Sequence, residues 1–355
     1  MREKRDPNLA VPAARDDLDW IDARAIGLEG RGFVDTAAPY DRLPRMARQV
    51  VSEAVWELQQ ESAGISVRFR TSSPEIRVRW SLTSPVLAST HMPATGVSGV
   101  DLYSESTGSP RFVGVGQPSG QSGNLARFPG SQDGQPCTFQ LNLPLYNGVT
   151  RLELGVPAGF GIEGVREKDR RPPLCFYGSS IVQGGCASRP GMPYAAIICR
   201  RLGVECINLG FSGSGRAEPE IVEILAELEA RAWVLDPLPN MSADTITERL
   251  GNLVRVLRRA HPRVPLVLVE HLRPSSLPPP PDRPMEEDWR RANRMLRELV
   301  NTLKREGTRD LTVVAGETLL GEDGEATVDG IHPTDLGFAR MAEVLGATVR
   351  EALGL

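Results

Sequence analysis

The residues best suited to covalent chemistry are a serine directly after an apolar run and a histidine three positions after an aspartate. Ser180 follows the apolar residues 174–177 and Gly178, and a glycine permits a sharp turn. Asp329 and His332 lie in one short segment, so the carboxylate can set the tautomer of the imidazole. An imidazole oriented in this way removes the proton of a serine hydroxyl and makes it a nucleophile. Taken singly, each segment is explained equally well by an ordinary turn.

Two further segments offer hydrogen-bond donors. The glycine-rich residues 208–215 follow a second apolar run and leave backbone N–H groups open to a ligand. Asn240 follows a third apolar run, in a path fixed by Pro237 and Pro239. Donors of this kind stabilise the negative oxygen that forms when a serine attacks a carbonyl group. A flexible turn also explains the glycines, and an asparagine in this position is commonly a helix cap.

The elements that must position these residues divide the chain into two halves. In the first half, Ile65, Val67 and Phe69 alternate with polar residues, and this period of two indicates strands with one buried face. Clusters of Gly, Pro, Ser and Asn separate the runs, as is typical of an antiparallel β-sandwich. Strands are expected at residues 65–70, 76–80, 99–103, 111–115, 138–143 and 151–156.

The second half alternates apolar runs with helical patterns. Leu250, Leu253, Val254 and Leu257 repeat at the spacing of one helical face. Continuous apolar strands between such helices predict an α/β fold with a parallel sheet of about five strands covered on both faces. In such a sheet, functional residues lie at the carboxyl ends of the strands. The strands are expected at residues 174–177, 205–209, 232–235, 265–270 and 311–315, and the helices at residues 194–202, 218–230, 243–260, 286–306 and 334–353.

We place the domain boundary in the charged segment that precedes Pro172 and Pro173, because charge and proline are typical of a linker. The predicted domains are a β-sandwich over residues 1–165 and a catalytic domain over residues 166–355.

Composition excludes several classes of partner. The formal net charge of −4 gives no general attraction for nucleic acid, and no apolar run is long enough to cross a bilayer. The five cysteines show no metal-binding spacing and suit a reducing compartment. The first residues are charged and lack the apolar stretch of a signal peptide. A cytoplasmic location is therefore expected, with a processed secreted form as the alternative, and the sequence does not specify an oligomeric state.

In order and context, the four segments resemble the four blocks of the SGNH hydrolases, also called the GDSL family. Two positions depart from the commoner pattern. Ser179 stands where that pattern has Asp, and the third block reads Leu-Pro-Asn-Met over residues 238–241 in place of Gly-x-Asn-Asp. The matched positions are Ser180, Gly213, Asn240, Asp329 and His332.

Residues 99–103, Gly-Val-Asp-Leu-Tyr, resemble the Gly-x-Asp-Leu-Tyr signature of a β-sandwich domain that precedes the hydrolase in one bacterial subgroup. Both departures look normal in that subgroup. The resemblance implies a three-layer α/β/α, flavodoxin-like SGNH hydrolase domain preceded by an antiparallel, jelly-roll-like sandwich. It also implies a serine esterase that needs no cofactor and no metal ion. Its triad would be Ser180, His332 and Asp329, and its oxyanion hole Ser180, Gly213 and Asn240.

The resemblance leaves the substrate open. We expect a small ester, an acetyl group on a carbohydrate or another polar alcohol, with Ser179, Gln183 and Arg189 near the substrate. A lysophospholipase or an acyl-thioesterase is the catalytic alternative, and a silent carbohydrate-binding protein on the same fold is the non-catalytic one. Structural roles are expected for His91, His261 and His271, and no second base accompanies Cys186.

Overall fold

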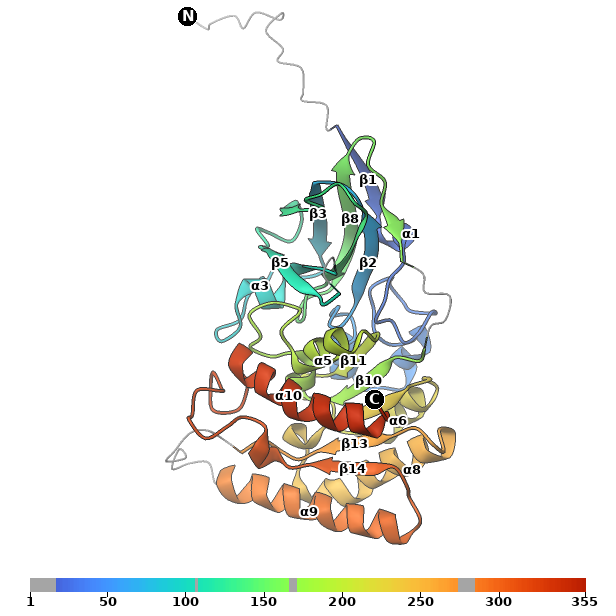
Figure 1. Cartoon of the computed structure of the whole chain (residues 1–355). Helices are drawn as coiled ribbons and strands as arrows, with labels where there is room; N and C mark the ends of the chain where they lie inside the picture. Colours follow the sequence, from blue (N-terminus) through green and yellow to red (C-terminus); the bar gives the residue numbers. More distant parts are fainter. Residues whose placement is uncertain (1–16, 106–107, 166–170, 274–284) are drawn as a thin grey trace, which may run out of the picture.

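An all-β unit lies beside an α/β unit, and Figure 1 shows the first above the second. The computed structural model describes residues 17–105, 108–165, 171–273 and 285–355. The linker expected before Pro172 lies almost entirely outside these residues, so the predicted boundary stays a prediction. Within the described part of the chain, no helix combines the length and the apolar composition of a membrane span.

The first unit is a sandwich of two antiparallel sheets with the strand orders β1-β8-β3-β6 and β5-β4-β7-β2-β9. The period of two read from the sequence is confirmed, because Ile65, Val67 and Phe69 are fully buried in the core between the sheets. The strands are β1 (Leu18–Asp22), β2 (Ser66–Thr71), β3 (Glu75–Leu82), β4 (Val100–Ser104), β5 (Arg111–Gly116), β6 (Asn124–Pro129), β7 (Cys137–Asn142), β8 (Val149–Pro157) and β9 (Glu163–Gly164).

Three strands, β1, β6 and β9, have no counterpart among the expected runs. All three lie at the edge of a sheet. An edge strand meets only one neighbour and is often short or interrupted by proline, so its sequence pattern is weak. In β6, Pro129 ends the strand, Asn124 is buried and Leu125 is 57% exposed, so polar and apolar residues do not follow the buried and exposed faces.

The second unit is a three-layer α/β/α domain around a parallel five-stranded sheet in the order β11-β10-β12-β13-β14. Counted along this domain alone, that order is 2-1-3-4-5, the flavodoxin-like arrangement. Every residue of β10 and β12 is buried, as expected of a strand covered on both faces. The strands are β10 (Leu174–Gly178), β11 (Cys206–Gly210), β12 (Ala232–Asp236), β13 (Leu266–Val269) and β14 (Leu311–Val314).

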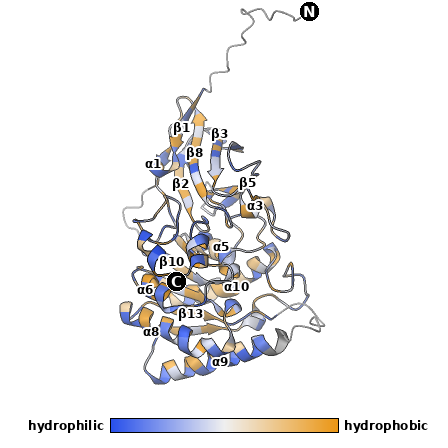
Figure 2. Cartoon of the chain, turned by 180° about the vertical axis from the view of Figure 1, so that it is seen from behind, coloured by the Kyte–Doolittle hydropathy of each residue, from blue (hydrophilic) through white to orange (hydrophobic). Residues whose placement is uncertain are grey.

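Helices cover both faces of this sheet. α5 (Tyr194–Leu202) and α10 (Asp335–Ala352) pack on one face, and α6 (Pro219–Ala226), α8 (Gly251–Ala260) and α9 (Met285–Arg305) pack on the other. Figure 2 shows α8 and α9 carrying hydrophilic and hydrophobic colours side by side, as expected of helices with one buried face. The other helical turns are α1 (Ala23–Ile26), α2 (Glu53–Leu58), α3 (Ala94–Val97), α4 (Ser180–Gln183), α7 (Ala243–Thr245), the 3₁₀ turns Arg45–Gln49, Leu238–Asn240 and Gly316–Thr318, and a π-helical turn at Ile246–Leu250.

The helical stretch expected over residues 243–260 is confirmed in extent, but it is not a regular α-helix throughout. A π-helical turn at Ile246–Leu250 joins α7 to α8. Ile246 and Leu250 are both buried, and the wider turn lets each reach the core while the helix continues into α8. Apolar spacing alone does not show such a turn.

One segment within the predicted sandwich domain also packs on the α/β domain. We call residues 29–62 the wrap segment (blue in Figure 1). Phe33, Leu43 and Val55 of this segment belong to the same core cluster as helices α6, α8 and α9. The hydrolase core is therefore built from both halves of the chain.

Arg42 connects the wrap segment to the end of β11 through hydrogen bonds. The guanidinium group is 2% exposed and donates from Nη1 to the carbonyl oxygens of Asn208, at 3.2 Å, and Gly210, at 2.7 Å. It also lies over the ring of Phe211, with 4.8 Å between the guanidinium carbon and the ring centroid. Burial lowers the pKa of Arg42 to about 10, and the nearby carboxyl group of Glu61 opposes that shift.

Candidate active site

The nucleophile position is built where β10 turns into α4. A Cβ atom at Gly178 would lie 2.2 Å from the carbonyl oxygen of Asp236, so only glycine lets the two strands approach this closely. Ser179 is fully buried, and its hydroxyl accepts the backbone N–H of Ile181 at 3.3 Å. Ser180 is the first residue of α4 and is 8% exposed. Ser179 is therefore the cap of α4, and the hydroxyl of Ser180 is the one that faces the site.

The three residues expected to form a triad lie in one hydrogen-bonded chain. The hydroxyl oxygen of Ser180 is 2.8 Å from Nε2 of His332, and Nδ1 of His332 is 2.7 Å from Oδ2 of Asp329. Oδ1 of Asp329 accepts the backbone N–H groups of Ile331, at 3.0 Å, and His332, at 2.7 Å. Burial opposes ionisation of Asp329, but these hydrogen bonds outweigh it and lower the pKa of the carboxyl group. The aspartate is thus held as an anion facing the imidazole.

The glycine-rich loop after β11 presents backbone donors beside Ser180. The backbone N–H of Ser212 donates to Oε1 of Gln183 at 2.9 Å, and those of Ser214 and Gly215 donate to the carbonyl oxygen of Phe211. Gly213 has φ of +67°, a left-handed conformation that favours glycine, and a Cβ atom there would meet nothing within 4 Å. Glycine is therefore needed at this position for its backbone conformation and not for lack of space.

Asn240 holds the same loop in place. Its Nδ2 donates to the carbonyl oxygens of Phe211, at 3.1 Å, and Gly215, at 3.4 Å. Asn240 ends the 3₁₀ turn Leu238–Asn240 after β12, where the sequence placed it near the glycine-rich loop. The amide thus lies against the loop, and its longer hydrogen bond is the one more easily exchanged for a ligand.

Gln183 was expected to contact the substrate, but the structure places it beneath the site. It is fully buried, and its Nε2 donates to Glu61 and, at 3.0 Å, to the carbonyl oxygen of Leu145. Its Oε1 accepts the backbone N–H of Ser212. With its amide engaged in this way, Gln183 positions the glycine-rich loop rather than a ligand.

Glu61 belongs to the wrap segment, and the pKa of its carboxyl group is raised. Burial raises the pKa of its carboxyl group to about 7, although the charge of Arg42 and the hydrogen bond from Gln183 act in the opposite direction. The wrap segment therefore supports the glycine-rich loop through both Arg42 and Glu61.

Arg189, the other residue expected at the substrate, lies in the interface between the two domains. Its Nη1 donates to Oδ2 of Asp101 at 2.7 Å and to the hydroxyl of Tyr103 at 2.5 Å. Its guanidinium carbon lies 3.9 Å from the centroid of the Phe112 ring. These contacts tie the sandwich to the loop after α4 and leave no support for a direct role in substrate binding.

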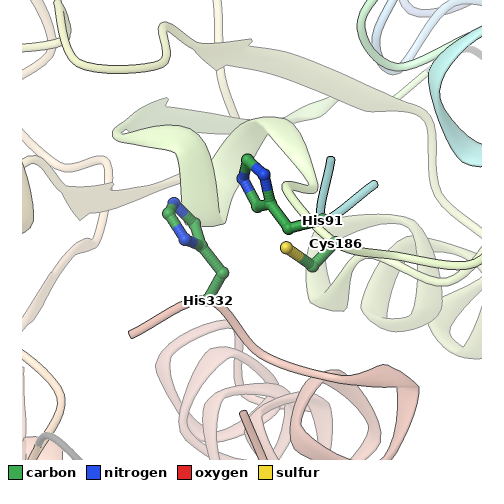
Figure 3. A group of neighbouring side chains, drawn as sticks. All are labelled: His91, Cys186 and His332. Carbon is green, nitrogen blue, oxygen red and sulfur yellow. The ribbon is translucent and has the colours of Figure 1, made fainter. Parts of the chain in front are cut away.

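Three residues that the sequence did not single out for the site lie around Ser180. Tyr146 comes from the sandwich domain and donates from its hydroxyl to the carbonyl oxygen of Ser180 at 3.2 Å. His91, given a structural role in the sequence analysis, has its ring centroid 5.6 Å from that of His332 (Figure 3). Cys186 lies beside both imidazoles. Cys186 follows Ser180 closely in sequence, but no local pattern reveals which sandwich loops contact this site, so the positions of Tyr146 and His91 could not be predicted.

The fold and the site define a two-domain α/β hydrolase with Ser180 at a strand end, hydrogen-bonded to His332, and family models agree. Residues 171–350 match the GDSL-like lipase/acylhydrolase family, and residues 18–162 match GxDLY, described as the N-terminus of SGNH-hydrolase-type esterases. The chain belongs to the GDSL-like lipase/acylhydrolase family. It is a carboxylic ester hydrolase.

Several solved structures are similar over most of their length. A protein from Bacteroides ovatus ATCC 8483 named as a GDSL-like lipase is 32% identical, with a TM-score of 0.88, and the match covers 95% of this chain and 98% of that one. The salicylyl-acyltransferase SsfX3 from a tetracycline biosynthetic pathway is 20% identical, with a TM-score of 0.76 and coverage of 96% and 98%. A family two carbohydrate esterase from Clostridium thermocellum, solved with cellohexaose, is 16% identical, with a TM-score of 0.55 and coverage of 82% and 92%. No curated protein matches the chain. The two more distant structures show a shared fold alone.

Proposed function

We propose that this chain hydrolyses a short acyl ester, an acetyl group carried by a carbohydrate or another polar alcohol, with Ser180 as the nucleophile. The observation that carries the proposal is the chain of hydrogen bonds from Ser180 through His332 to Asp329, at 2.8 Å and 2.7 Å. These are the distances over which an imidazole can take a proton from a hydroxyl group while a carboxylate orients it.

In the first step, the Ser180 oxygen attacks the ester carbonyl carbon as its proton passes to Nε2 of His332. The tetrahedral intermediate collapses, and the imidazolium returns the proton to the leaving alcohol. Water then attacks the acyl-enzyme, His332 takes its proton, and the carboxylic acid leaves with Ser180 restored. Throughout, Asp329 stabilises the positive imidazolium and fixes its orientation.

Three donors would meet the negative oxygen of the intermediate. Ser180 begins α4, where a backbone N–H has no carbonyl in its own helix to donate to. Gly213 would offer its backbone N–H, and Asn240 would exchange its longer contact with Gly215 for the oxyanion. Each such donor stabilises the transition state by about 3–4 kcal/mol.

The surroundings of Ser180 favour a polar alcohol. His91 brings an exposed imidazole to the site, with its ring centroid 5.6 Å from that of His332. A long acyl chain would need an extended apolar surface at this point. The similarity in fold to a carbohydrate esterase solved with cellohexaose supports a sugar ester as the first substrate to test.

The decisive experiment compares acetylated sugars with p-nitrophenyl esters of two to twelve acyl carbons, using Ser180→Ala as the blank and Ser179→Ala as the matched control. We expect the highest kcat/KM for acetyl esters, retained activity in Ser179→Ala and none in Ser180→Ala. A preference for eight or more carbons, or for thioesters, would favour the lysophospholipase or thioesterase alternative instead. Full activity in Ser180→Ala would refute the assignment.

A fluorophosphonate probe separates an enzyme from a silent sugar-binding protein. Because the probe reacts with activated serines, wild-type protein is expected to be labelled and Ser180→Ala is not. Failure to label folded wild-type protein would favour the binding protein.

A further inference from the structure

Three potential metal ligands meet beside the nucleophile. His91, Cys186 and His332 each offer one ligand atom, and these atoms all lie within 4.8 Å of one another (Figure 3). They come from three separate places in the fold: the sandwich loop before α3, the loop after α4 and the loop before α10. Two imidazoles and one thiol are a ligand set that zinc and its analogue cobalt prefer, and three protein ligands leave a fourth position open.

The hydrogen bonds around the cluster indicate which atoms face the common centre. Nδ1 of His332 is engaged by Asp329, so a metal ion would bind Nε2 and replace its hydrogen bond with the Ser180 hydroxyl. Nδ1 of His91 lies 3.3 Å from the Ser89 hydroxyl, which leaves Nε2 of that ring for a metal ion. Cys186 adopts φ of +71°, a left-handed conformation in the turn that follows Gly185. A Cβ atom built at Gly185 would lie 3.2 Å from Cδ2 of His332, so this turn passes along the Nε2 side of the ring.

We propose that these three residues bind a Zn²⁺ or Co²⁺ ion and that the bound ion reversibly inhibits the enzyme. The inhibition rests on the proposed function, in which His332 is the general base. Ligand atoms around tetrahedral zinc lie roughly 3.4–3.8 Å apart, so the present spread requires a closure of about 1 Å. His91 is exposed and lies in a loop, and it can supply that adjustment.

Binding changes the bonding of His332 without any redox step. Its Nε2 lone pair, which accepts the Ser180 proton during catalysis, is donated to the metal ion instead. The Cys186 thiol coordinates as a thiolate and releases its proton to the solvent. Ser180 then keeps its proton and loses its base, so ester hydrolysis stops until a chelator removes the ion.

The first test titrates Zn²⁺ into the esterase assay, with each variant compared with its own metal-free rate. We expect at least tenfold inhibition of the wild type, full reversal by EDTA, and an inhibition constant at least tenfold weaker in His91→Ala and in Cys186→Ser. His261→Gln and Cys137→Ser remove an imidazole and a thiol far from the cluster and should keep the wild-type inhibition constant. Equal inhibition constants in the wild type and in the His91→Ala/Cys186→Ser double variant would overturn the proposal.

The second test measures Co²⁺ binding by absorption spectroscopy and does not depend on esterase activity. Co²⁺ added to wild-type protein should produce the near-ultraviolet charge-transfer band of a cobalt–thiolate bond, and Cys186→Ser should lose it while Cys137→Ser keeps it. Ser180→Ala, which lacks the nucleophile, should retain the band. The metal site is thereby tested even if the proposed esterase reaction fails. Absence of the band in folded wild-type protein at saturating Co²⁺ would overturn the site.

Discussion

Arg189 of the hydrolase domain donates from Nη1 to Oδ2 of Asp101, at 2.7 Å, and Asp101 is the aspartate of the Gly-x-Asp-Leu-Tyr segment. Asp101 is fully buried, and it also accepts the backbone N–H of Gly191 at 2.9 Å and Nδ2 of Asn142 at 2.8 Å. The signature segment of the sandwich thus carries a buried carboxylate that anchors the loop after α4. Its physical role is to fix one domain on the other.

The first prediction is that removing the Arg189–Asp101 ion pair lowers the free energy of unfolding more than it lowers the rate of catalysis. Arg189→Ala leaves the Asp101 carboxylate buried without its cation, a loss of about 3–5 kcal/mol for pairs of this kind. We expect a lower urea midpoint, with Arg189→Lys intermediate because lysine keeps the charge but not the two-donor geometry. Unfolding monitored by circular dichroism measures the effect. A raised KM with unchanged stability would instead mean that Arg189 contacts the substrate.

The second prediction concerns the carboxylate of the triad. Asp329→Asn keeps the size of the side chain but cannot hold His332 in the tautomer that accepts the serine proton, and a loss in kcat of about 10⁴-fold is expected. Stability should change little, because Asp329 is partly exposed. Steady-state rates on p-nitrophenyl acetate, with the urea midpoint as the control, test it. A loss of less than tenfold would mean that Asp329 is not the orienting group.

The third prediction concerns Asn240. Asn240→Ala removes both a proposed oxyanion donor and the contacts of Nδ2 with the carbonyl groups of Phe211 and Gly215. We expect kcat to fall by about 10²–10³-fold with a smaller change in KM, because the oxyanion exists only after attack on the carbonyl. A variant in which KM rises and kcat is preserved would indicate a purely structural role in holding the loop.

The fourth prediction uses the buried carboxyl group of Asp236, which ends β12 beneath the nucleophile turn. Burial raises its pKa to about 8, only partly opposed by the hydrogen bond from Tyr194, and Oδ1 has no partner among the described residues. The folded state therefore keeps a proton that the unfolded chain releases near pH 4. The stability associated with that proton is present at low pH and is lost as the pH rises from about 4 to 8.

Asp236→Asn removes this titration. The free energy of unfolding of the wild type should fall relative to that of the variant between pH 5 and pH 8, by at most about 4 kcal/mol. Urea unfolding at both pH values gives the difference, and subtracting the two proteins cancels the other titrating groups. Identical pH dependence in both proteins would show that Asp236 ionises normally.

The sequence predicts the positions of those site residues that directly follow a strand of the parallel sheet. Ser180, Asn240 and the glycine-rich loop each follow a strand of one parallel sheet, and parallel strands bring their carboxyl ends to one edge. Their convergence therefore follows from topology. Asp329 and His332 could be added because both lie in one turn before the last helix.

Contacts between the domains could not be predicted in the same way. Arg189 and Gln183 follow the nucleophile in sequence, which suggested the substrate, but their partners Asp101 and Glu61 lie 88 and 122 positions away. The local sequence pattern predicts the helix, strand or turn in which a side chain lies. It does not predict which loop of the other domain contacts that side chain. The same reason explains why His91 was given a structural role and then found beside His332.

The wrap segment determines where the chain can be cut to obtain a stable catalytic fragment. A fragment cut at the end of the sandwich would retain every proposed catalytic side chain but lose Arg42, whose cation closes the end of β11, and the apolar cover that Phe33 and Leu43 provide. Grafting a new sandwich onto this hydrolase would similarly have to carry residues 29–62 along. The exchangeable unit is thus the α/β domain together with the wrap segment.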